Sequence, residues 1–436
     1  MKKRIENTVL ILLALIAVFV GTWAGLLMKE NLFEKKTEAE GTTAVEATTA
    51  EQEATTEETT QATTEPTTQQ AVTEEPVIDF SDISVIDIYP LSLASGTGDI
   101  RHCQGIAVDV VNEYIYYSYT TSLVKCDFKG NIIGTITGIQ GHLGDITLHE
   151  NRKKIYASYN PQGKKALYVA IIDVENLNRT GVDALSSGLI KTVHLKEVYD
   201  DFTATVDVNG KPRTRRYGVA GTDGICFGPS FENSEGYFLT VACGITPQTY
   251  RKDNDYQILL QYDVDEFDKY AQPLSFSYFH HNGPASKGKY FLFTGNTNCG
   301  IQTMVYFDEL NLWLLNVYPT TKREYQKFTM FAIDGDVKPY EGLLKGQPQE
   351  DRQKILTLYK DGVFDKKHDT YGWYSKAGDL GMSYLGSGLF YIIHPFETWY
   401  ERQTAVAYLY VWDPSDEFPF TLAAGIGSDY TISKKK

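Results

Sequence analysis

The sequence predicts an all-β domain built from repeated four-stranded antiparallel units, preceded by a membrane anchor and a flexible linker. From Val77 onward, short apolar segments alternate with turn residues about every 8–12 positions, a spacing typical of all-β folds. Similar Gly-containing segments recur along the same region. The 30 Tyr and 21 Phe, against five Met, also favour strands, because aromatic rings fit a pleated, half-buried surface.

The N-terminus has the pattern of a membrane anchor. Residues 1–8 form a short basic tail, and Val9–Met28 is an apolar run without a charge. About 20 helical residues span ~30 Å, the thickness of a bilayer's hydrocarbon core. Positive charge before the run favours a cytoplasmic N-terminus, which places the rest of the chain outside the cell. We expect an uncleaved single-pass anchor; the alternative, a secretory signal cleaved near Ala24, also exports the domain.

The composition of residues 29–76 predicts a disordered linker. Ten Glu and no Lys or Arg lie between Thr37 and Pro76, among many Thr, Ala and Gln residues. Such a segment has too little apolar surface to offset the entropy lost on folding. Much of the formal net charge of −15 is therefore local to the linker. The domain expected at 77–436 has no basic surface that would indicate a nucleic-acid partner.

The pattern predicts that the domain contains five successive repeats. In the first, turn residues join four strands in about 35 residues, which is typical of one β-propeller blade. The expected strands are Ile106–Val110, Tyr114–Tyr119, Leu123–Asp127 and Ile132–Thr137; Asp145–Leu148, Lys154–Tyr159, Ala166–Val174 and Leu189–Leu195; Gly224–Gly228, Gly236–Ala242, Asp255–Val264 and Gln272–Tyr278; Ile301–Phe307, Leu312–Tyr318, Phe328–Ile333 and Lys354–Tyr359; and Met382–Leu385, Leu389–His394, Ala405–Trp412 and Phe418–Leu422. Ser84–Tyr89 is available to close the ring. The predicted fold is a β-propeller of five four-stranded blades, or of six if the spare strand Tyr290–Thr294 belongs to another blade.

Each repeat begins with polar residues, a glycine and a large aliphatic residue. The first strand of a blade lines the central channel, where glycine lets neighbouring blades approach closely. The polar residues at these starts should therefore converge at one end of the channel; they are His102, Gln104, His142, Asp145, Asp223, Asn298 and Asp379. A hairpin with an Asn209-Gly210 turn is expected in the insertion between Glu197 and Gly221.

Through the starts HxQGI, GHLGDI and GTDGI, residues 83–425 resemble the broad class of exported β-propellers, which includes lactonase-like, NHL-like and apyrase-like members. These starts are not a signature of one activity, and WD40, kelch and Asp-box motifs are absent from the sequence. The resemblance therefore implies a propeller fold without implying a substrate.

The starts supply candidate site residues. His142 and Asp145 are the candidate catalytic pair, because an imidazole and a carboxylate can act as general base and acid. A divalent cation, calcium first, is the expected cofactor, since carboxylate and amide oxygens suit it; its candidate ligands are Asp145, Asp223, Asn298 and Asp379. Candidate ligand-binding residues are His102, Gln104 and His281, together with Arg215 and Arg216 of a basic cluster that could bind a phosphate or uronate. The alternative is that these groups only hydrogen-bond neighbouring blades or lie in a solvated loop.

Two functions remain open at this point. The first is a membrane-anchored extracytoplasmic enzyme, a cation-assisted hydrolase or lyase with its site in the channel. The second is a non-catalytic surface module that binds a glycan or protein through its loops. The expected partners are the cell membrane and a small-molecule or glycan ligand. The five Cys residues have no zinc-site spacing, and we expect most of them to be buried.

Overall fold

The computed structural model describes residues 78–79, 89–99, 101–208, 210–232, 235–346, 352–375, 380–397, 403–413, 417–423 and 431–432. All of them belong to one compact unit, Thr73–Lys436. The expected anchor and linker lie outside these ranges. Among the described residues, no helix is long and apolar enough to cross a membrane.

The first and second sheets follow the sequence prediction closely. The first sheet consists of the antiparallel strands β3 (Cys103–Asp109), β4 (Tyr114–Tyr119), β5 (Ser122–Asp127) and β6 (Ile132–Thr137), with β10 (Val182–Asp183) parallel to β6. The second consists of β7 (Gly141–Leu148), β8 (Lys154–Pro161), β9 (Tyr168–Asp173) and β11 (Ile190–His194). The short strand β17 (Gln272–Pro273) adds to the edge of the second sheet by pairing with β11.

The third sheet corrects one predicted strand. It consists of β14 (Val219–Pro229), β15 (Tyr237–Ile245), β16 (Tyr256–Tyr262) and β18 (Gly288–Phe293), extended by β23 (Arg352–Ile355) and β22 (Tyr340–Leu343). The prediction of Gln272–Tyr278 as its fourth strand is wrong, because the spare segment at 290–294 takes that position. The alternating apolar residues Leu274 and Phe276 instead pack against the core between the first two sheets.

The fourth sheet consists of β19 (Asn298–Phe307), β20 (Leu312–Tyr318) and β21 (Met330–Asp334). A short pairing of β15 with β19, Gly244 with Gly300 and Ile245 with Cys299, joins it to the third sheet. The expected fourth strand, Lys354–Tyr359, is divided between two sheets. Lys354 and Ile355 pair with β18 of the third sheet, whereas the Tyr359 N–H donates to the Ala332 carbonyl of the fourth. This segment therefore bridges the outer edges of the two sheets.

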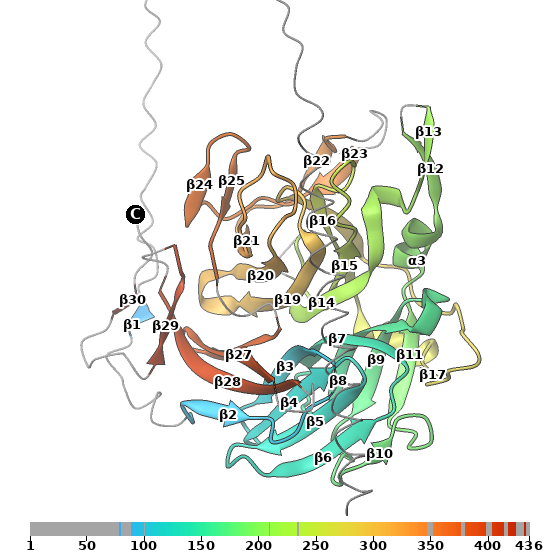
Figure 1. Ribbon diagram of the computed structural model, residues 1–436, viewed down its shortest axis with the longest axis vertical. Helices are drawn as coiled ribbons and strands as arrows, with labels where there is room; N and C mark the ends of the chain where they lie inside the picture. The colour runs from blue at the N-terminus through green and yellow to red at the C-terminus, as the bar shows by residue number, and fades with distance from the viewer. Residues whose placement is uncertain are drawn as a thin grey trace, which may run out of the picture. The chain divides into compact units, whose positions relative to one another are not determined.

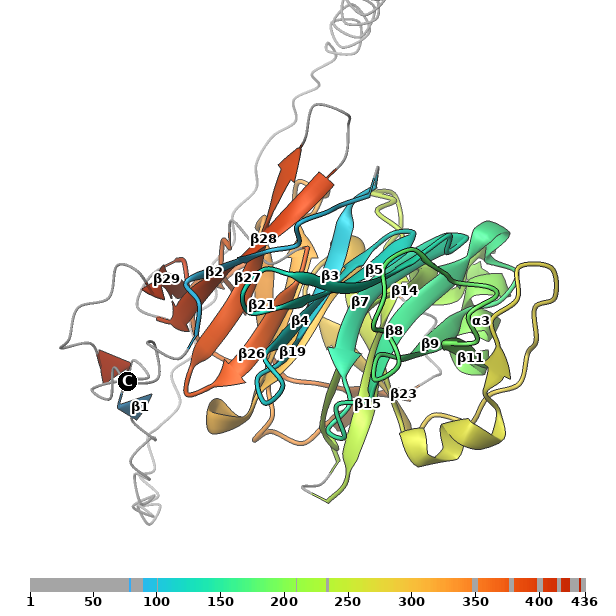
Figure 2. The ribbon, with the colours of Figure 1, turned by 90° about the horizontal axis from the view of Figure 1, so that it is seen from below.

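The fifth sheet is completed from both ends of the domain. Its strands are β26 (Met382–Gly386), β27 (Leu389–Glu397) and β28 (Gln403–Trp412), and β29 (Phe420–Leu422) pairs with one end of β28. The other end pairs with β2 (Ser92–Ala94), from the start of the described chain (Figure 2). The closing strand is therefore β2 and not Ser84–Tyr89, of which only Tyr89 is described, in a bend. The pair β1 (Ile78–Asp79) and β30 (Thr431–Ile432) also joins the two ends.

The inner strands contact one another in a ring, in the order β3, β7, β14, β19, β26 and back to β3. Figure 1 shows the sheets following one another around this common centre. Glycine is needed where inner strands meet: a Cβ on Gly105 would lie 2.8 Å from Asp145 Cα of the second sheet. A Cβ on Gly224 would lie 2.7 Å from Ile301 of the fourth sheet. The predicted role of these glycines in close approach is confirmed.

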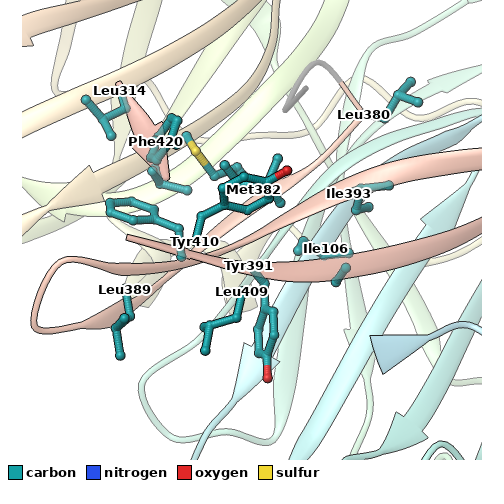
Figure 3. Packing of buried hydrophobic residues seen from close by; sticks show 14 of the residues in the cluster. Ile106, Leu314, Leu380, Met382, Leu389, Tyr391, Ile393, Leu409, Tyr410 and Phe420 are labelled. Atoms are coloured by element: carbon teal, nitrogen blue, oxygen red, sulfur yellow. The ribbon is translucent and has the colours of Figure 1, made fainter. Parts of the chain in front are cut away.

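Apolar clusters fill each space between neighbouring sheets. One lies between the first and second sheets, one between the second and third, and one between the third and fourth. The largest joins the fourth, fifth and first sheets. Figure 3 shows its members Met382 and Leu409 of the fifth sheet together with Ile106 of the first and Leu314 of the fourth.

The long insertion before β14 carries the α-helix α3 (Lys196–Thr203) and the hairpin of β12 (Thr205–Val208) and β13 (Lys211–Thr214). The expected hairpin is confirmed. A second small hairpin, β24 (Val363–Asp365) and β25 (Thr370–Gly372), lies beside β21 (Figure 1). Short 3-10 helices occur at η1 (Gln162–Lys164), η2 (Arg216–Gly218), η3 (Val264–Lys269) and η4 (Asp308–Leu310).

Candidate functional site

Irregular pairing marks the start of the inner strands. The β3–β4 ladder shifts register between Cys103 and Gly105, and the β7–β8 ladder shifts between Leu143 and Ile146. The ladders of β14 and β19 shift at equivalent positions. Bulges of this kind turn side chains away from the regular alternation of a strand. Polar groups that interact with one another lie at this end of the ring, which we call the channel mouth; its residues are His102, His142, Lys164, Asp223, Cys299 and Gln302. Gln104, next to them in sequence, contacts the Thr120 hydroxyl at 3.2 Å.

His142 and Asp223 meet at the channel mouth. His142 Nδ1 lies 3.7 Å from Asp223 Oδ1, just beyond a direct hydrogen bond. This Nδ1 is buried and has no hydrogen-bond partner among the described residues. The side chains nevertheless remain 35% and 19% exposed. The pair therefore combines an unsatisfied polar atom with access from solvent.

Burial keeps both groups near their neutral forms. It lowers the pKa of His142 to about 4, helped by the positive charges of Lys164, Arg101 and His102. It raises the pKa of Asp223 to about 7, although the Lys164 charge and a Gln302 hydrogen bond oppose the shift. At neutral pH, His142 is uncharged and both protonation states of Asp223 are populated.

Lys164 brings a positive charge to the mouth from the loop between β8 and β9. Its ammonium donates to the Ala220 carbonyl at the start of β14. A Cβ on Gly221 would lie 3.0 Å from Lys164 Nζ and 2.8 Å from Asn160 Oδ1, so glycine leaves room for both groups. Burial lowers the pKa of Lys164, while the carboxylate of Asp223 opposes that shift.

Asp145 lies deeper on the axis than the mouth. Its side chain is 1% exposed, and Oδ2 accepts hydrogen bonds from the N–H groups of Ile225, at 3.1 Å, and Met304, at 3.2 Å. Burial raises the pKa of this carboxyl well above its usual range. Asp145 thus joins β7 to β14 and β19, and solvent does not reach it as it reaches Asp223.

The other predicted residues are distributed as follows. Asn298 begins β19, where its Oδ1 accepts a hydrogen bond from the Cys299 thiol at 3.6 Å. The Arg215 guanidinium lies over the Phe202 ring at 5.1 Å and lowers the pKa of Lys164. Arg216 pairs instead with Asp201 of α3, at 3.8 Å.

His281, a candidate ligand-binding residue, lies apart from the channel mouth. Its ring packs at 4.7 Å from that of His194, at the end of the outer strand β11, and at 5.1 Å from that of Tyr199 in α3. The long loop after β17 carries it along the second sheet's outer edge rather than toward the axis. Asp379 lies outside the described residues.

Sequence reasoning missed Lys164, Cys299 and Gln302. Gln302 follows the glycine of the fourth start by two residues, so the repeat pattern could have indicated it. Cys299 has a left-handed backbone (φ 69°) and is exposed, whereas the other four Cys residues are buried. No disulfide forms among the described residues. Nor does any group of three or more His, Cys, Asp or Glu residues in the described ranges have the arrangement of a metal site.

A cavity of about 200 Å³ lies on the axis on the far side of Asp145. All the inner strands contribute to its lining, through Ile106, Ile146, Cys226, Met304 and Met382 and their neighbours. Aromatic side chains, including Phe227, Tyr237 and Tyr384, also line it. The axis therefore has a charged mouth at one end and an aromatic cavity at the other.

The ring of inner strands and the axial channel define a β-propeller. No family model and no curated protein matches the chain. Similar solved structures include the β-propeller domain of Cps50 (Swd1) from Myceliophteria thermophila, with 8% identity, TM-score 0.30, and coverage of 70% of this chain and 83% of that chain. The Dos1 propeller has 11% identity, TM-score 0.30, and coverage of 74% and 70%. The PQQ domain of pyranose dehydrogenase from Coprinopsis cinerea has 10% identity, TM-score 0.29, and coverage of 70% and 82%. These low values say nothing about function, and the assignment rests on the cyclic contacts within this chain.

Proposed function

We propose that the channel mouth binds a small anionic ligand and that His142 and Asp223 transfer a proton to or from it, as in a hydrolase or a lyase. The observation behind this proposal is the solvent-accessible pair at 3.7 Å beside the ammonium of Lys164. A carboxyl group with a pKa of about 7 is suited to general acid–base chemistry, because both of its protonation states are populated at neutral pH.

The positive groups around the mouth support an anionic ligand. Lys164, Arg101 and His102 are close enough to lower the pKa of His142, and Arg215 lowers that of Lys164. A bound anion would reduce the mutual repulsion of these groups. The proton-transfer role assigned by sequence to Asp145 is better suited to Asp223, because the Asp145 carboxylate is enclosed and already accepts two backbone N–H groups.

A calcium ion is a separate proposal for the same oxygens, because calcium bound to Asp223 would hold it as the carboxylate and replace its proton-transfer role. Asp223 and Asn298 would offer it oxygen ligands at the mouth, whereas Asp145 lies deeper and Asp379 lies outside the described residues. Metal analysis of the purified chain, with its melting temperature measured with and without a chelator, tests this part. A chain without bound metal and a melting temperature unaffected by chelator would contradict it.

We further infer that the propeller has five blades and is held outside the cell by its N-terminal anchor. The cyclic order of the five inner strands supports the blade count. The uncharged run Val9–Met28 after a basic tail supports the location.

A non-catalytic binding module is the second candidate. It is favoured by the hairpin of the long insertion, where the Arg213 guanidinium lies 5.1 Å from the ring centre of Tyr250, a residue 62% exposed. An exposed ring with an arginine beside it could contact a glycan or a protein partner.

The test compares two adjacent lysines. Calorimetric binding of inorganic phosphate and of pyruvate should weaken at least tenfold in Lys164→Met, because a charged hydrogen bond is lost at the mouth. Lys165→Met is the matched control, since Lys165 is exposed and lies over the Phe279 ring at 5.6 Å. Equal affinity in the two variants would overturn the proposed mouth site.

The proton-transfer role is tested separately. The pyruvate affinity of the native chain should fall between about pH 6 and 8 as Asp223, with its raised pKa, becomes negatively charged, and Asp223→Asn should remove that fall; pyruvate is used because its own carboxylate does not titrate in this range. If the pH dependence persists in Asp223→Asn, the mouth binds anions without this residue acting as the proton-transfer group, and the binding-module candidate is preferred.

A further inference from the structure

A second pocket lies away from the axis, between the outer edges of the third and fourth sheets. Its volume is about 430 Å³, within the range of small-molecule sites. We call it the rim pocket. Tyr256 and Phe293 line it from the third sheet, Tyr340 and Lys345 from β22 and the chain after it, and Tyr371 from the β24–β25 hairpin. None of these residues belongs to the channel mouth.

Aromatic rings form much of the rim pocket. The Tyr256 and Phe293 rings pack edge to face with centres 5.2 Å apart, and the Tyr256 hydroxyl accepts the Lys345 N–H at 3.0 Å. Tyr340 is 55% exposed. Tyr371 stacks on Phe364 with ring centres 4.5 Å apart. Exposed ring faces beside phenolic hydroxyls suit a ligand that has both a C–H face and hydroxyl groups.

Two lysines bring positive charge to the rim pocket. Lys345 and Lys360 line it, and among the described residues neither forms an ion pair. Lys345 Nζ lies 4.1 Å from the centre of the Phe293 ring, which orients the ammonium without removing its charge. Asp369 is the only acidic residue among the described lining residues. On a chain of formal net charge −15, this is a locally positive concavity.

A buried network holds one wall of the rim pocket in place. His368 Nδ1 contacts Asp365 Oδ2 at 2.7 Å, and its ring packs 4.6 Å from that of Tyr325. The Tyr325 hydroxyl donates to Asp255 at 2.8 Å, and Asp255 pairs with the buried Lys322. These contacts position His368 before a ligand arrives, which reduces the entropy lost on binding.

We propose that the rim pocket binds an acidic sugar, a pyranose ring that carries a carboxylate. The ring of the exposed Tyr340 and that of the half-buried Tyr371 contact the C–H face of the sugar ring. Lys345 and Lys360 bind the carboxylate. The same chemistry fits a free oligosaccharide or a residue within an acidic polysaccharide, and this site is separate from the anion site proposed at the channel mouth.

Calorimetry on the full chain tests this with digalacturonate, and with maltose as a neutral disaccharide. We expect digalacturonate to bind at least tenfold more tightly than maltose. Lys345→Ala combined with Lys360→Ala should remove that preference, and Tyr340→Ala should weaken both sugars. These side chains are exposed, so the variants should keep the native melting temperature. Lys191→Ala, at an exposed position on β11, is the matched control and should bind as the native chain does.

Several outcomes would overturn the proposal. Equal binding of the two sugars, or an unchanged affinity in the double lysine variant, would remove the role of charge. Loss of digalacturonate binding in Lys164→Met, with binding kept in the double lysine variant, would place the sugar at the channel mouth instead. Displacement by an aspartate-rich peptide of equal affinity would show that sugar chemistry is not selected. Comparing digalacturonate with polygalacturonate per residue distinguishes the two sources of the ligand.

Discussion

At the scale of single residues, one position along an inner strand separates two environments for a carboxylate. In the second repeat the acidic residue follows the glycine, as Gly144-Asp145, whereas in the third it precedes the glycine, as Asp223-Gly224. Asp145 consequently lies deeper on the axis, where its Oδ2 accepts hydrogen bonds from the backbone N–H groups of Ile225 and Met304. Asp223 lies nearer to solvent and meets His142.

Two replacements of Asp145 distinguish the effect of its charge on stability from the effect of its hydrogen bonds. Because burial raises its pKa, its folded form holds a proton that the unfolded chain releases; the stability it contributes is present at low pH and is lost as the pH rises. Asp145→Asn keeps an acceptor without the charge, so it should be more stable than the native chain at pH 8 and depend less on pH. Asp145→Ala should be less stable, by about 1–3 kcal/mol for each N–H left without an acceptor. Urea unfolding at several pH values measures the free energy of unfolding of both variants. An Asn variant less stable than the Ala variant would contradict this account.

His142 and Asp223 should give pH dependences of opposite sign. The pKa of His142 falls to about 4 on folding, so its contribution to stability grows as the pH rises from about 4 to 6.5. The pKa of Asp223 rises to about 7, so its contribution is lost as the pH rises from about 4 to 7. Asp223→Asn should therefore make the free energy of unfolding rise more steeply with pH in this window than in the native chain, and His142→Gln should make it rise less. Parallel pH profiles for both variants and the native chain would show that neither shift exists.

At the scale of elements, β2 closes the ring by contacts with two sheets. It pairs with β28 of the fifth sheet, and its Leu93 carbonyl accepts a hydrogen bond from the Tyr117 hydroxyl of the first sheet at 2.7 Å. The Ser95 hydroxyl, directly after β2, accepts from the Tyr119 hydroxyl at 2.8 Å and from the Ala405 N–H at 3.2 Å. β29 pairs with the same edge of β28, but its Leu422 is exposed whereas Leu93 of β2 is buried.

Replacing one leucine in each of these two strands compares how much β2 and β29 contribute to stability. Leu93 is 3% exposed, so Leu93→Ala should lower the free energy of unfolding by about 2–5 kcal/mol through a cavity at the closure. Leu422 of β29 is 45% exposed, and Leu422→Ala should change stability by less than about 0.5 kcal/mol. Urea unfolding of the two variants measures the difference. Similar losses would mean that β2 has no special role in closure.

At the scale of the whole molecule, local pattern predicted most strands because each blade forms from consecutive segments. The strands of the first repeat and the glycine at each start were correct for this reason. The errors concern segments that could pair with more than one sheet. Gln272–Tyr278 alternates like a strand but packs on the second sheet, and Lys354–Tyr359 serves two sheets; neither choice is encoded in local periodicity.

Some residues of the candidate site could likewise be predicted from local sequence pattern, and others could not. His142 and Asp223 could be placed at the mouth because both belong to inner-strand starts. Lys164 could not, because it comes from a loop between other strands and reaches the mouth only where Gly221 lacks a Cβ. The position of His281 could not be predicted either, because a long loop carries it along the second sheet to His194.

The strand β2 has a mechanical consequence. It is the first element of the ring along the chain, and the expected membrane anchor precedes it in the sequence. Tension between a tethered N-terminus and the domain would pass through the short β1–β30 pair and then into the β2–β28 ladder, before it reached any complete sheet. Pulling on the N-terminus should thus open the seam beside the fifth sheet first, while a pull applied within an intact sheet would have to disrupt a full four-stranded unit.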